Sequence, residues 1–244
     1  MSRTAFIIGD SGAGKSHSIQ FLNPEETVII NPNTKDLPWK GSGKAYKKFN
    51  KDTKEGNVFN VNKPLHVLNV LDYVNKEMPH IKNIIIDDHT HIYTIGVYRQ
   101  GIKEEETAKH NRQPVNIYQK FTDIATGTID IANKSKELRD DLTVFIMHHV
   151  DYEGDGIIES KRVKAASFGK FVEEKVKGVE SLFTIVLLAD KRYDENENIE
   201  GFFITKSADA SIKTPSGMFD TKEIPNNLQI VKDAMTCYYD EENC

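Results

Sequence analysis

A glycine-rich turn near the start of the chain constrains the fold more than any other feature of the sequence. Residues 9–16 read Gly-Asp-Ser-Gly-Ala-Gly-Lys-Ser and match the pattern G-x-x-x-x-G-K-[ST]. The apolar run 5–8 precedes the turn, and a helix-compatible stretch follows it. Glycine lets a backbone curl into a concave nest whose N–H groups point at an anion. A strand, such a turn and a helix therefore predict the opening of an α/β fold.

The same turn predicts a binding site for a nucleoside triphosphate, with ATP and Mg²⁺ as the expected cofactors. We expect Lys15 to reach the β- and γ-phosphates and Ser16 to ligate the magnesium ion. The alternative is a glycine-rich turn that merely joins a strand to a helix. The expected nucleotide-binding residues are Gly9, Asp10, Ser11, Gly12, Ala13, Gly14, Lys15, Ser16 and His17.

Short apolar runs alternate with helical patterns along the rest of the chain. This alternation predicts a mainly parallel central sheet with helices on both faces. The expected strands are 4–8, 27–31, 58–61, 83–87, 142–147, 182–189 and 201–205, and the expected helices are 14–22, 64–77, 115–138, 168–177 and 227–239, the last capped by an asparagine. A length of 244 residues without an internal repeat suits one domain over 1–244.

Composition limits the partners and the location of the chain. The net charge of −5 argues against indiscriminate coating of nucleic acid, so such contacts require a local patch, repeated in an oligomer. The longest apolar runs, 142–147 and 182–189, are too short to cross a bilayer, and no leader pattern opens the chain. We therefore expect a cytoplasmic protein without a membrane partner, with Cys237 and Cys244 as reduced thiols.

A second acidic motif follows the expected strand 83–87, which reads Asn-Ile-Ile-Ile-Asp before Asp88. Parallel strands present their carboxyl ends at one edge of a sheet, where the glycine-rich turn also opens. We expect Asp87 to hold the magnesium ion, and Asp88 to orient or deprotonate the attacking water. The alternative for Asp88 is a helix cap or a solvated neighbour. Glu25 and Glu26 are weaker candidates for the general base.

A histidine pair, His148 and His149, ends the expected strand 142–147. One imidazole beside the γ-phosphate would sense that group and signal to the following loop. Neighbouring residues of a strand face opposite sides, so only one of the two can point at the site. The alternatives are a zinc ligand or a capping histidine. His89 and His91 are interpreted as loop or helix-start residues.

Basic residues in the second half of the chain are candidates for contacts outside the nucleotide site. Lys161, Arg162 and Lys164 lie in a polar loop that suits the phosphates of single-stranded nucleic acid, or else form a solvated surface. Lys206 and Lys213 flank a late strand and turn. In an oligomer either lysine would reach the γ-phosphate of a neighbouring subunit, and the alternative is two surface lysines.

Five segments in order, GDSGAGKS, IIIDD, FIMHH, KTPSGMF and IPNNLQIV, resemble the phage-type RecA-like ATPases. These are single-domain relatives of the RecA and RadA recombinases used in single-strand annealing and recombination. The likeness covers nearly the whole chain. It implies a RecA-like core, ring or filament assembly, and work on single-stranded DNA beside a single-stranded-DNA-binding protein, in the host cytoplasm if the chain is phage-encoded.

By this resemblance the turn 9–16 binds nucleotide, Asp87 serves magnesium, and His148 or His149 occupies the sensor position. The loop 151–166 would face DNA. One departure stands out, because RecA carries its catalytic glutamate on an earlier strand and this sequence has no clear equivalent.

Two other functions fit the same motif. A nucleotide kinase or other phosphotransferase usually needs several arginines around the transferred phosphoryl group, and this chain has only scattered arginines. A nucleotide-switched binding module would use ATP for assembly without significant turnover. ATP hydrolysis stimulated by DNA is the function that the sequence favours.

Overall fold

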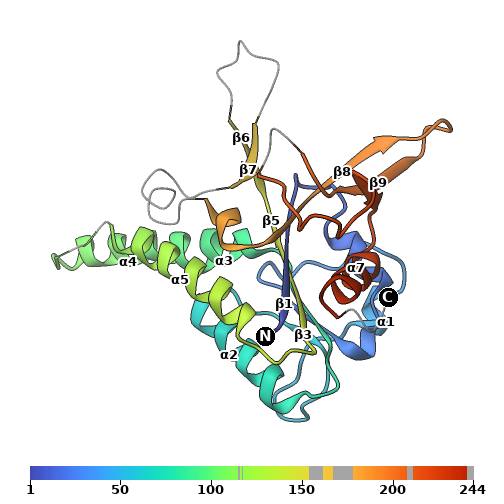
Figure 1. Cartoon of the computed structure of the whole chain (residues 1–244). Coiled ribbons are helices and arrows are strands. Elements are labelled where there is room, and N and C mark those ends of the chain that lie inside the picture. The colour runs from blue at the N-terminus through green and yellow to red at the C-terminus, as the bar shows by residue number, and fades with distance from the viewer. Residues whose placement is uncertain (115, 117, 154–161, 167–177, 208–210, 241–244) are drawn as a thin grey trace.

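The protein is described by a computed structural model that covers residues 1–114, 116, 118–153, 162–166, 178–207 and 211–240. Its centre is an eight-stranded sheet in the order β10-β9-β8-β1-β5-β4-β2-β3 (Figure 1). Within this sheet the six strands β8, β1, β5, β4, β2 and β3 pair in parallel with their neighbours. The strands β9 and β10 add an antiparallel edge beside β8. The expected α/β fold with a mainly parallel sheet is confirmed.

The sheet strands are β1 (Arg3–Ile8), β2 (Thr27–Ile30), β3 (Val58–Phe59), β4 (Asn83–Ile86), β5 (Thr143–His148), β8 (Ile185–Tyr193), β9 (Ile199–Ile204) and β10 (Glu223–Pro225), and a separate hairpin consists of β6 (Val150–Glu153) and β7 (Arg162–Ala165). The helices are α1 (Ser42–Ala45), α2 (Pro64–Glu77), α3 (His89–Tyr93), α4 (Arg99–His110), α5 (Gln119–Lys136) and α7 (Leu228–Tyr239), with short 3₁₀ segments η1 (Ser16–Phe21), η2 (Pro24–Glu26) and η4 (Val179–Leu182) and a π-helical turn η3 (Thr94–Tyr98).

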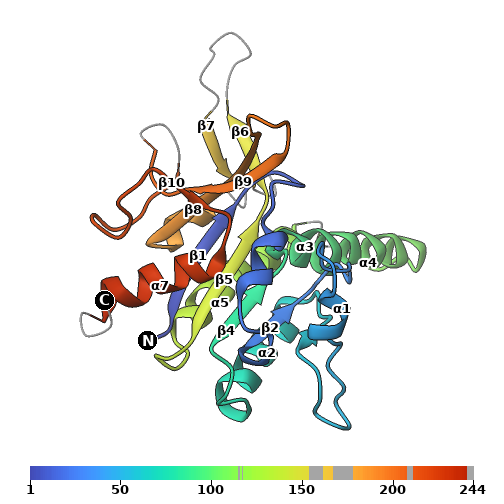
Figure 2. The ribbon, with the colours of Figure 1, turned by 90° about the vertical axis from the view of Figure 1, so that its right-hand side faces the viewer.

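Both faces of the sheet are covered, and alternate residues of each strand face opposite layers. Phe6 and Ile8 of β1 pack in one apolar cluster with α2, α3 and α5, whereas Ala5 and Ile7 pack in the other with η1 and α7. Figures 1 and 2 show α2 and α5 on one side of the strands and α7 on the other. This burial on both faces explains why the central strands read as continuous apolar runs.

Several boundaries differ from the expectation. The segment expected as an α-helix over 14–22 is the 3₁₀ helix η1, in which Ser18 N donates to both Gly14 O and Lys15 O. The Ser18 hydroxyl also donates to Lys15 O at 2.6 Å, and such local side-chain bonds compete with α-helical pairing. The helix expected over 115–138 narrows to α5, and α4, β6, β7 and β10 were not expected. The helix expected over 168–177 lies outside the described residues.

The C-terminal helix α7 begins as expected, because the Asn227 side chain caps it by accepting a hydrogen bond from Gln229 N at 2.8 Å. Within α7, Cys237 is disulfide-bonded, so the expectation of reduced thiols is wrong for this residue. Cys244 lies outside the described residues. Within the described part of the chain, no helix is both long and apolar enough to pass through a bilayer.

Candidate functional site

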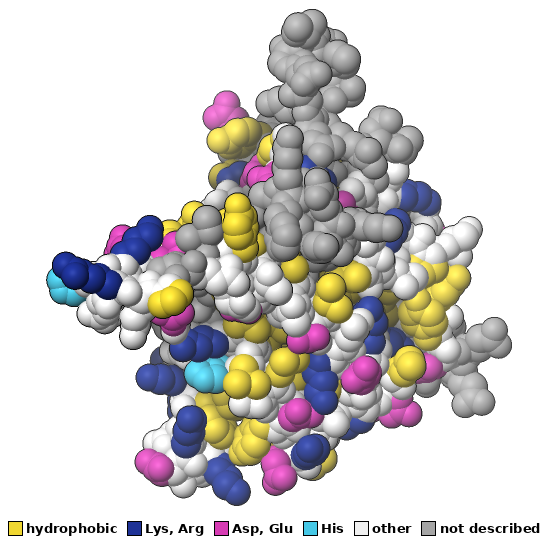
Figure 3. Space-filling model, turned by 90° about the vertical axis from the view of Figure 1, so that its left-hand side faces the viewer, with side chains coloured by type: hydrophobic (Ala, Val, Ile, Leu, Met, Phe, Trp, Pro, Cys, Tyr) yellow, Lys and Arg dark blue, Asp and Glu magenta, His cyan; other side chains and the backbone are white. Residues whose placement is uncertain are grey.

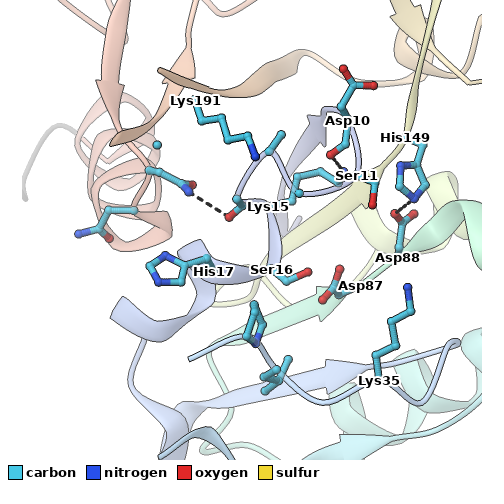
Figure 4. Close-up of a pocket in the computed structure, with 18 of the residues that line it drawn as sticks. Asp10, Ser11, Lys15, Ser16, His17, Lys35, Asp87, Asp88, His149 and Lys191 are labelled. Atoms are coloured by element: carbon cyan, nitrogen blue, oxygen red, sulfur yellow. Dashed lines mark hydrogen bonds and ion pairs between the residues drawn. The ribbon is translucent and has the colours of Figure 1, made fainter. Parts of the chain in front are cut away.

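A cavity of about 950 Å³ opens at the carboxyl edge of the parallel strands. The turn after β1, the residues after β4 and the residue after β5 meet there, because parallel neighbours end at the same edge. Figure 4 shows these side chains converging from different strands. The residues of the glycine-rich turn that line the cavity are Asp10, Ser11, Gly12, Ala13, Gly14, Lys15, Ser16 and His17, whereas Gly9 is not part of the lining.

The turn takes its curvature from glycines. Gly12 and Gly14 have φ of 80° and 94°, in the left-handed region that disfavours side chains. A Cβ built on Gly14 would lie 2.3 Å from Asn226 Nδ2, which donates a hydrogen bond to Gly14 O at 3.0 Å. The start of the last helix therefore braces the turn from outside, and an alanine at Gly14 would displace that brace.

Lys15 lies inside the turn. Its amine donates to Gly9 O at 2.6 Å and to Asp10 O at 2.9 Å, and the residue is 6% exposed. Burial lowers the pKa of Lys15, while the nearby Asp88 and Asp87 carboxylates act in the opposite direction. The two carbonyls hold the amine where an incoming phosphate could exchange for them with charge-assisted bonds.

Asp87 and Ser16 meet across the cavity floor (Figure 4). Removal from water and the neighbouring Asp88 raise the pKa of Asp87 to about 6, although a hydrogen bond with the Ser16 side chain and the Lys15 charge act against that rise. A carboxyl group with a raised pKa, in contact with a hydroxyl oxygen, is a position that a cation would stabilise. The two oxygen donors therefore fit Mg²⁺, which prefers such ligands.

Asp88 forms a second polar pair. Its Oδ2 lies 3.0 Å from His149 Nε2, and its Oδ1 accepts a hydrogen bond from Thr90 N at 2.8 Å, which caps α3. Burial alone would raise the pKa of Asp88, but the hydrogen bond and charge of His149, helped by His148 and Lys15, hold it well below its usual range. Asp88 is therefore both the helix cap and the partner of the histidine. The Asp87–Asp88 peptide bond is cis.

Of the two histidines that the sequence placed at the site, only His149 lines the cavity. His148 is 1% exposed and packs against Phe6 in the apolar layer that contains α2, α3 and α5. Its Nδ1 lies 3.0 Å from His89 Nδ1, and its Nε2 lies 2.9 Å from Ala166 O. The catalytic role expected for His148 is corrected on this geometry, because strand alternation turns its ring away from the cavity.

The cavity lining includes Lys191, Lys35 and His91, which the sequence did not assign to the site. Lys191 of β8 points toward the glycine-rich turn (Figure 4), and a Cβ built on Gly12 would lie 3.7 Å from its amine. Lys35 and His91 line the cavity from the loop after β2 and from α3. The position of Lys191 just past the expected strand 182–189 was a usable signal, whereas the fold alone places Lys35 and His91.

The weaker candidates for a base fall elsewhere. Glu25 and Glu26 lie in η2, immediately before β2, and hence at the amino edge of the sheet, opposite the cavity. Their role as general base is therefore not supported by position.

The two candidate trans-acting lysines also lie away from the cavity lining. The Lys206 amine lies 3.5 Å from Phe219 O, and Lys213 pairs through its backbone with Val186 of β8. A role toward a neighbouring subunit stays a prediction for both.

The basic loop lies partly beyond the described chain. Lys161 is outside the described residues, whereas Arg162 and Lys164 belong to β7 of the β6–β7 hairpin. The hairpin is tied to the glycine-rich turn, because the Tyr152 hydroxyl donates a short hydrogen bond to the Asp10 carboxylate. This contact, with burial, raises the pKa of Tyr152 to about 12.

Comparison with known proteins adds no relative: no protein-family model and no curated protein sequence matches this chain.

Proposed function

We propose that this chain is a magnesium-dependent ATPase with a RecA-like core that acts on single-stranded DNA. One observation carries the enzymatic part of the proposal. The amine of Lys15, the hydroxyl of Ser16 and the carboxylate of Asp87 converge on one cavity beside a turn of backbone N–H groups. These are the donors that a triphosphate and its divalent ion require.

The lining of the cavity combines cationic and apolar side chains. Lys15, Lys35 and Lys191 line the cavity and would neutralise the phosphates. Apolar surface for a nucleobase would come from other lining residues, namely Phe21, Leu37, Pro38, Ile199, Pro225 and Ile230. A volume of about 950 Å³ accommodates a whole nucleotide.

The Asp88–His149 pair supplies the proton chemistry of hydrolysis. Ionised Asp88 accepts a hydrogen bond from His149 Nε2, so Nδ1 is the ring atom that we assign as the proton acceptor. Water attacks the γ-phosphorus, the bond to the β–γ bridging oxygen breaks, and His149 takes the water's proton while ADP and phosphate form. Asp88 then stabilises the imidazolium. Magnesium at Ser16 and Asp87 would spread the charge of the phosphates.

The DNA-directed part of the proposal rests on the resemblance and on the β6–β7 hairpin. The hairpin extends from the same edge of the sheet as the cavity (Figure 1) and carries Arg162 and Lys164. Through the hydrogen bond between Tyr152 and Asp10, DNA bound at the hairpin would change the conformation of the glycine-rich turn. Figure 3 shows basic, acidic and apolar side chains interspersed among the described residues of the face that carries α4.

Assembly completes the proposal. A chain of charge −5 gains DNA affinity by repeating a local patch, which fits a ring or filament beside a single-stranded-DNA-binding protein. Lys206 or Lys213 would serve the γ-phosphate of a neighbour in such an assembly. The cytoplasm is the expected compartment.

The test is ATP binding and hydrolysis by the full chain with Mg²⁺, with and without single-stranded DNA. Lys15→Ala is expected to weaken ATP binding by about 100-fold or more, because it removes the buried cation nearest the phosphates. Lys103→Ala, at an exposed lysine of α4, is the matched control and should bind as the wild type does. Equal affinity in Lys15→Ala would remove the proposal.

Turnover separates the remaining functions. Hydrolysis stimulated by DNA supports the recombinase-type ATPase. Turnover that requires a small phosphate acceptor would instead identify a phosphotransferase. Binding and assembly without turnover would identify a nucleotide-switched module.

A further inference from the structure

His91, His149 and Asp88 form a cluster beside the magnesium position that the ATPase proposal does not use in full. One ligand atom from each residue lies within 4.8 Å of the other two. The carboxylate comes from the N-cap of α3, one imidazole from the first turn of that helix, and the other from the residue after β5. Three potential ligands thus come from two elements that the fold holds side by side.

One ring nitrogen of His91 has no partner within the described chain. Nδ1 of His91 is buried and makes no hydrogen bond there. The His91 and His149 rings lie with their centroids 5.5 Å apart and their planes at 70°. A buried polar atom without a hydrogen-bond partner is costly in free energy, and in native proteins it commonly marks the place of an ordered water or ion.

We propose that Asp88, His91 and His149 form a binding site for a divalent transition-metal ion, of which Zn²⁺ is the probe. Two imidazoles and one carboxylate are a donor set that such ions prefer, whereas Mg²⁺ prefers oxygen donors. The two neighbouring carboxylates then serve different ions. Asp87, which contacts the Ser16 side chain, holds magnesium, and Asp88, which contacts His149, holds the transition metal.

The separations fit such an ion after a small closure. Zinc lies about 2.0–2.2 Å from nitrogen and oxygen ligands, so tetrahedral ligand atoms are about 3.3–3.5 Å apart. The Asp88 Oδ2 to His149 Nε2 distance of 3.0 Å is already near this value, and the remaining separations are at most 4.8 Å. His91 closes the site by side-chain rotation.

Thr90 supports the cluster from behind. Its backbone N–H donates to Asp88 Oδ1 at 2.8 Å, and its hydroxyl oxygen accepts from the backbone N–H of His149 at 2.9 Å. Such contacts orient metal ligands and tune their affinity. Because all three side chains line the cavity, a fourth position of a bound ion would be open to water or a phosphate oxygen.

A bound ion and the proton chemistry above exclude each other. The ion would replace the proton of His149 Nε2, which moves to Nδ1, so Nδ1 can no longer accept a proton from water. Inhibition of hydrolysis by the ion follows, and that consequence rests on the proposed function. Binding of the ion does not, because it needs no nucleotide.

The test is titration of the nucleotide-free full chain with Zn²⁺ by calorimetry, and with Co²⁺ by its visible absorption. We expect one ion per chain in the wild type and an affinity lower by about 100-fold in His91→Ala. His91 is only half-buried, and circular dichroism will confirm that the variant folds. His66→Ala, at an exposed histidine of α2, and Ser16→Ala, at the magnesium position, should both keep the wild-type Zn²⁺ affinity.

Two results would overturn the site. One is a wild type that takes up no Zn²⁺, and the other is a His91→Ala variant that binds as tightly as His66→Ala. The second result would assign the uptake to adventitious surface histidines. Loss of nucleotide binding in Ser16→Ala with Zn²⁺ binding retained would separate this site from the ATPase proposal.

Discussion

Two pairs of histidines lie at the carboxyl ends of β4 and β5, and they occupy opposite environments. The inner pair, His89 and His148, is 1% exposed at each residue and lies in the apolar layer beneath α3 and α5. The outer pair, His91 and His149, lines the cavity. His149 directly follows His148, and His91 lies two residues after His89, so a short step along the chain takes a histidine from the core to the site.

The inner pair is satisfied by protein partners. The Tyr93 hydroxyl lies 2.8 Å from His89 Nε2, the two Nδ1 atoms are 3.0 Å apart, and His148 Nε2 lies 2.9 Å from Ala166 O. Because the carbonyl can only accept, His148 carries its proton on Nε2, and His89 must then donate from Nδ1. Burial lowers the pKa of both rings, in keeping with this neutral chain of bonds.

The outer pair is not fully hydrogen-bonded within the described chain. His149 contacts Asp88 through one nitrogen, and Nδ1 of His91 makes no hydrogen bond within the described chain. The comparison teaches that residue type does not assign a role here. Whether the ring's nitrogens are already paired separates a structural histidine from a functional one.

The largest effect should come from the outer pair. His149→Ala removes the proposed proton acceptor, so we expect ATP turnover to fall by about 10²–10⁴-fold with little change in unfolding free energy. The measurement is steady-state hydrolysis, paired with a urea unfolding curve. His66→Ala is the control for loss of a histidine at an exposed position. Full turnover in His149→Ala would place the proton acceptor elsewhere.

The pattern of the fold was predictable from sequence because the central strands are buried on both faces. Runs such as 84–86 and 142–147 contain too many consecutive apolar residues for a half-exposed strand, and they became β4 and β5. The helix α4 was not predictable in this way. It buries none of its described side chains, and its residues are mostly polar or charged, so it lacks the apolar residues by which the other helices were predicted.

Site residues that directly follow a strand could be predicted from the sequence. Site residues that long-range packing brings to the cavity could not. The turn 9–16 and the residues after β4 follow from strand ends alone. Sequence alternation also required one histidine of the pair to turn away, but the choice between His148 and His149 needed the strand's orientation. His91 and Lys191 enter the site through α3 and the β8–β9 hairpin, whose placement depends on long-range contacts.

The inner pair should show the opposite response to mutation. His148→Ala leaves a cavity and removes the partner of His89 Nδ1 and of Ala166 O, so we expect a loss of about 2–4 kcal/mol in unfolding free energy. Urea unfolding measures the loss, and ATP affinity per folded molecule should change little. A stable variant with impaired turnover would reverse the roles assigned to the two pairs.

Tyr93→Phe tests the last hydrogen bond of the inner histidine pair, and it changes the shape of the side chain less than His148→Ala does. The substitution removes only the hydroxyl, and it leaves His89 Nε2 buried without its donor. We expect a loss of about 1–2 kcal/mol in unfolding free energy. The matched control is Tyr118→Phe, because the Tyr118 side chain is 63% exposed. Similar unfolding midpoints for the two variants would show that the hydroxyl does not complete the chain of bonds.

The smallest effect on unfolding free energy is expected at Asp141, a carboxylate at the amino edge of the sheet, opposite the cavity. Asp141 pairs with Lys82 and Arg139, and although partial burial opposes the shift, these partners lower its pKa. Its side chain is 41% exposed, so solvent screens the pair, and Asp141→Asn should cost no more than about 0.5 kcal/mol at neutral pH. Because the folded pKa is depressed, the contribution is present above the unfolded pKa of about 3.9 and disappears as pH falls below it. Unfolding curves of wild type and variant should therefore converge in acid, and a gap that persists unchanged there would mean that Asp141 acts through packing instead of charge.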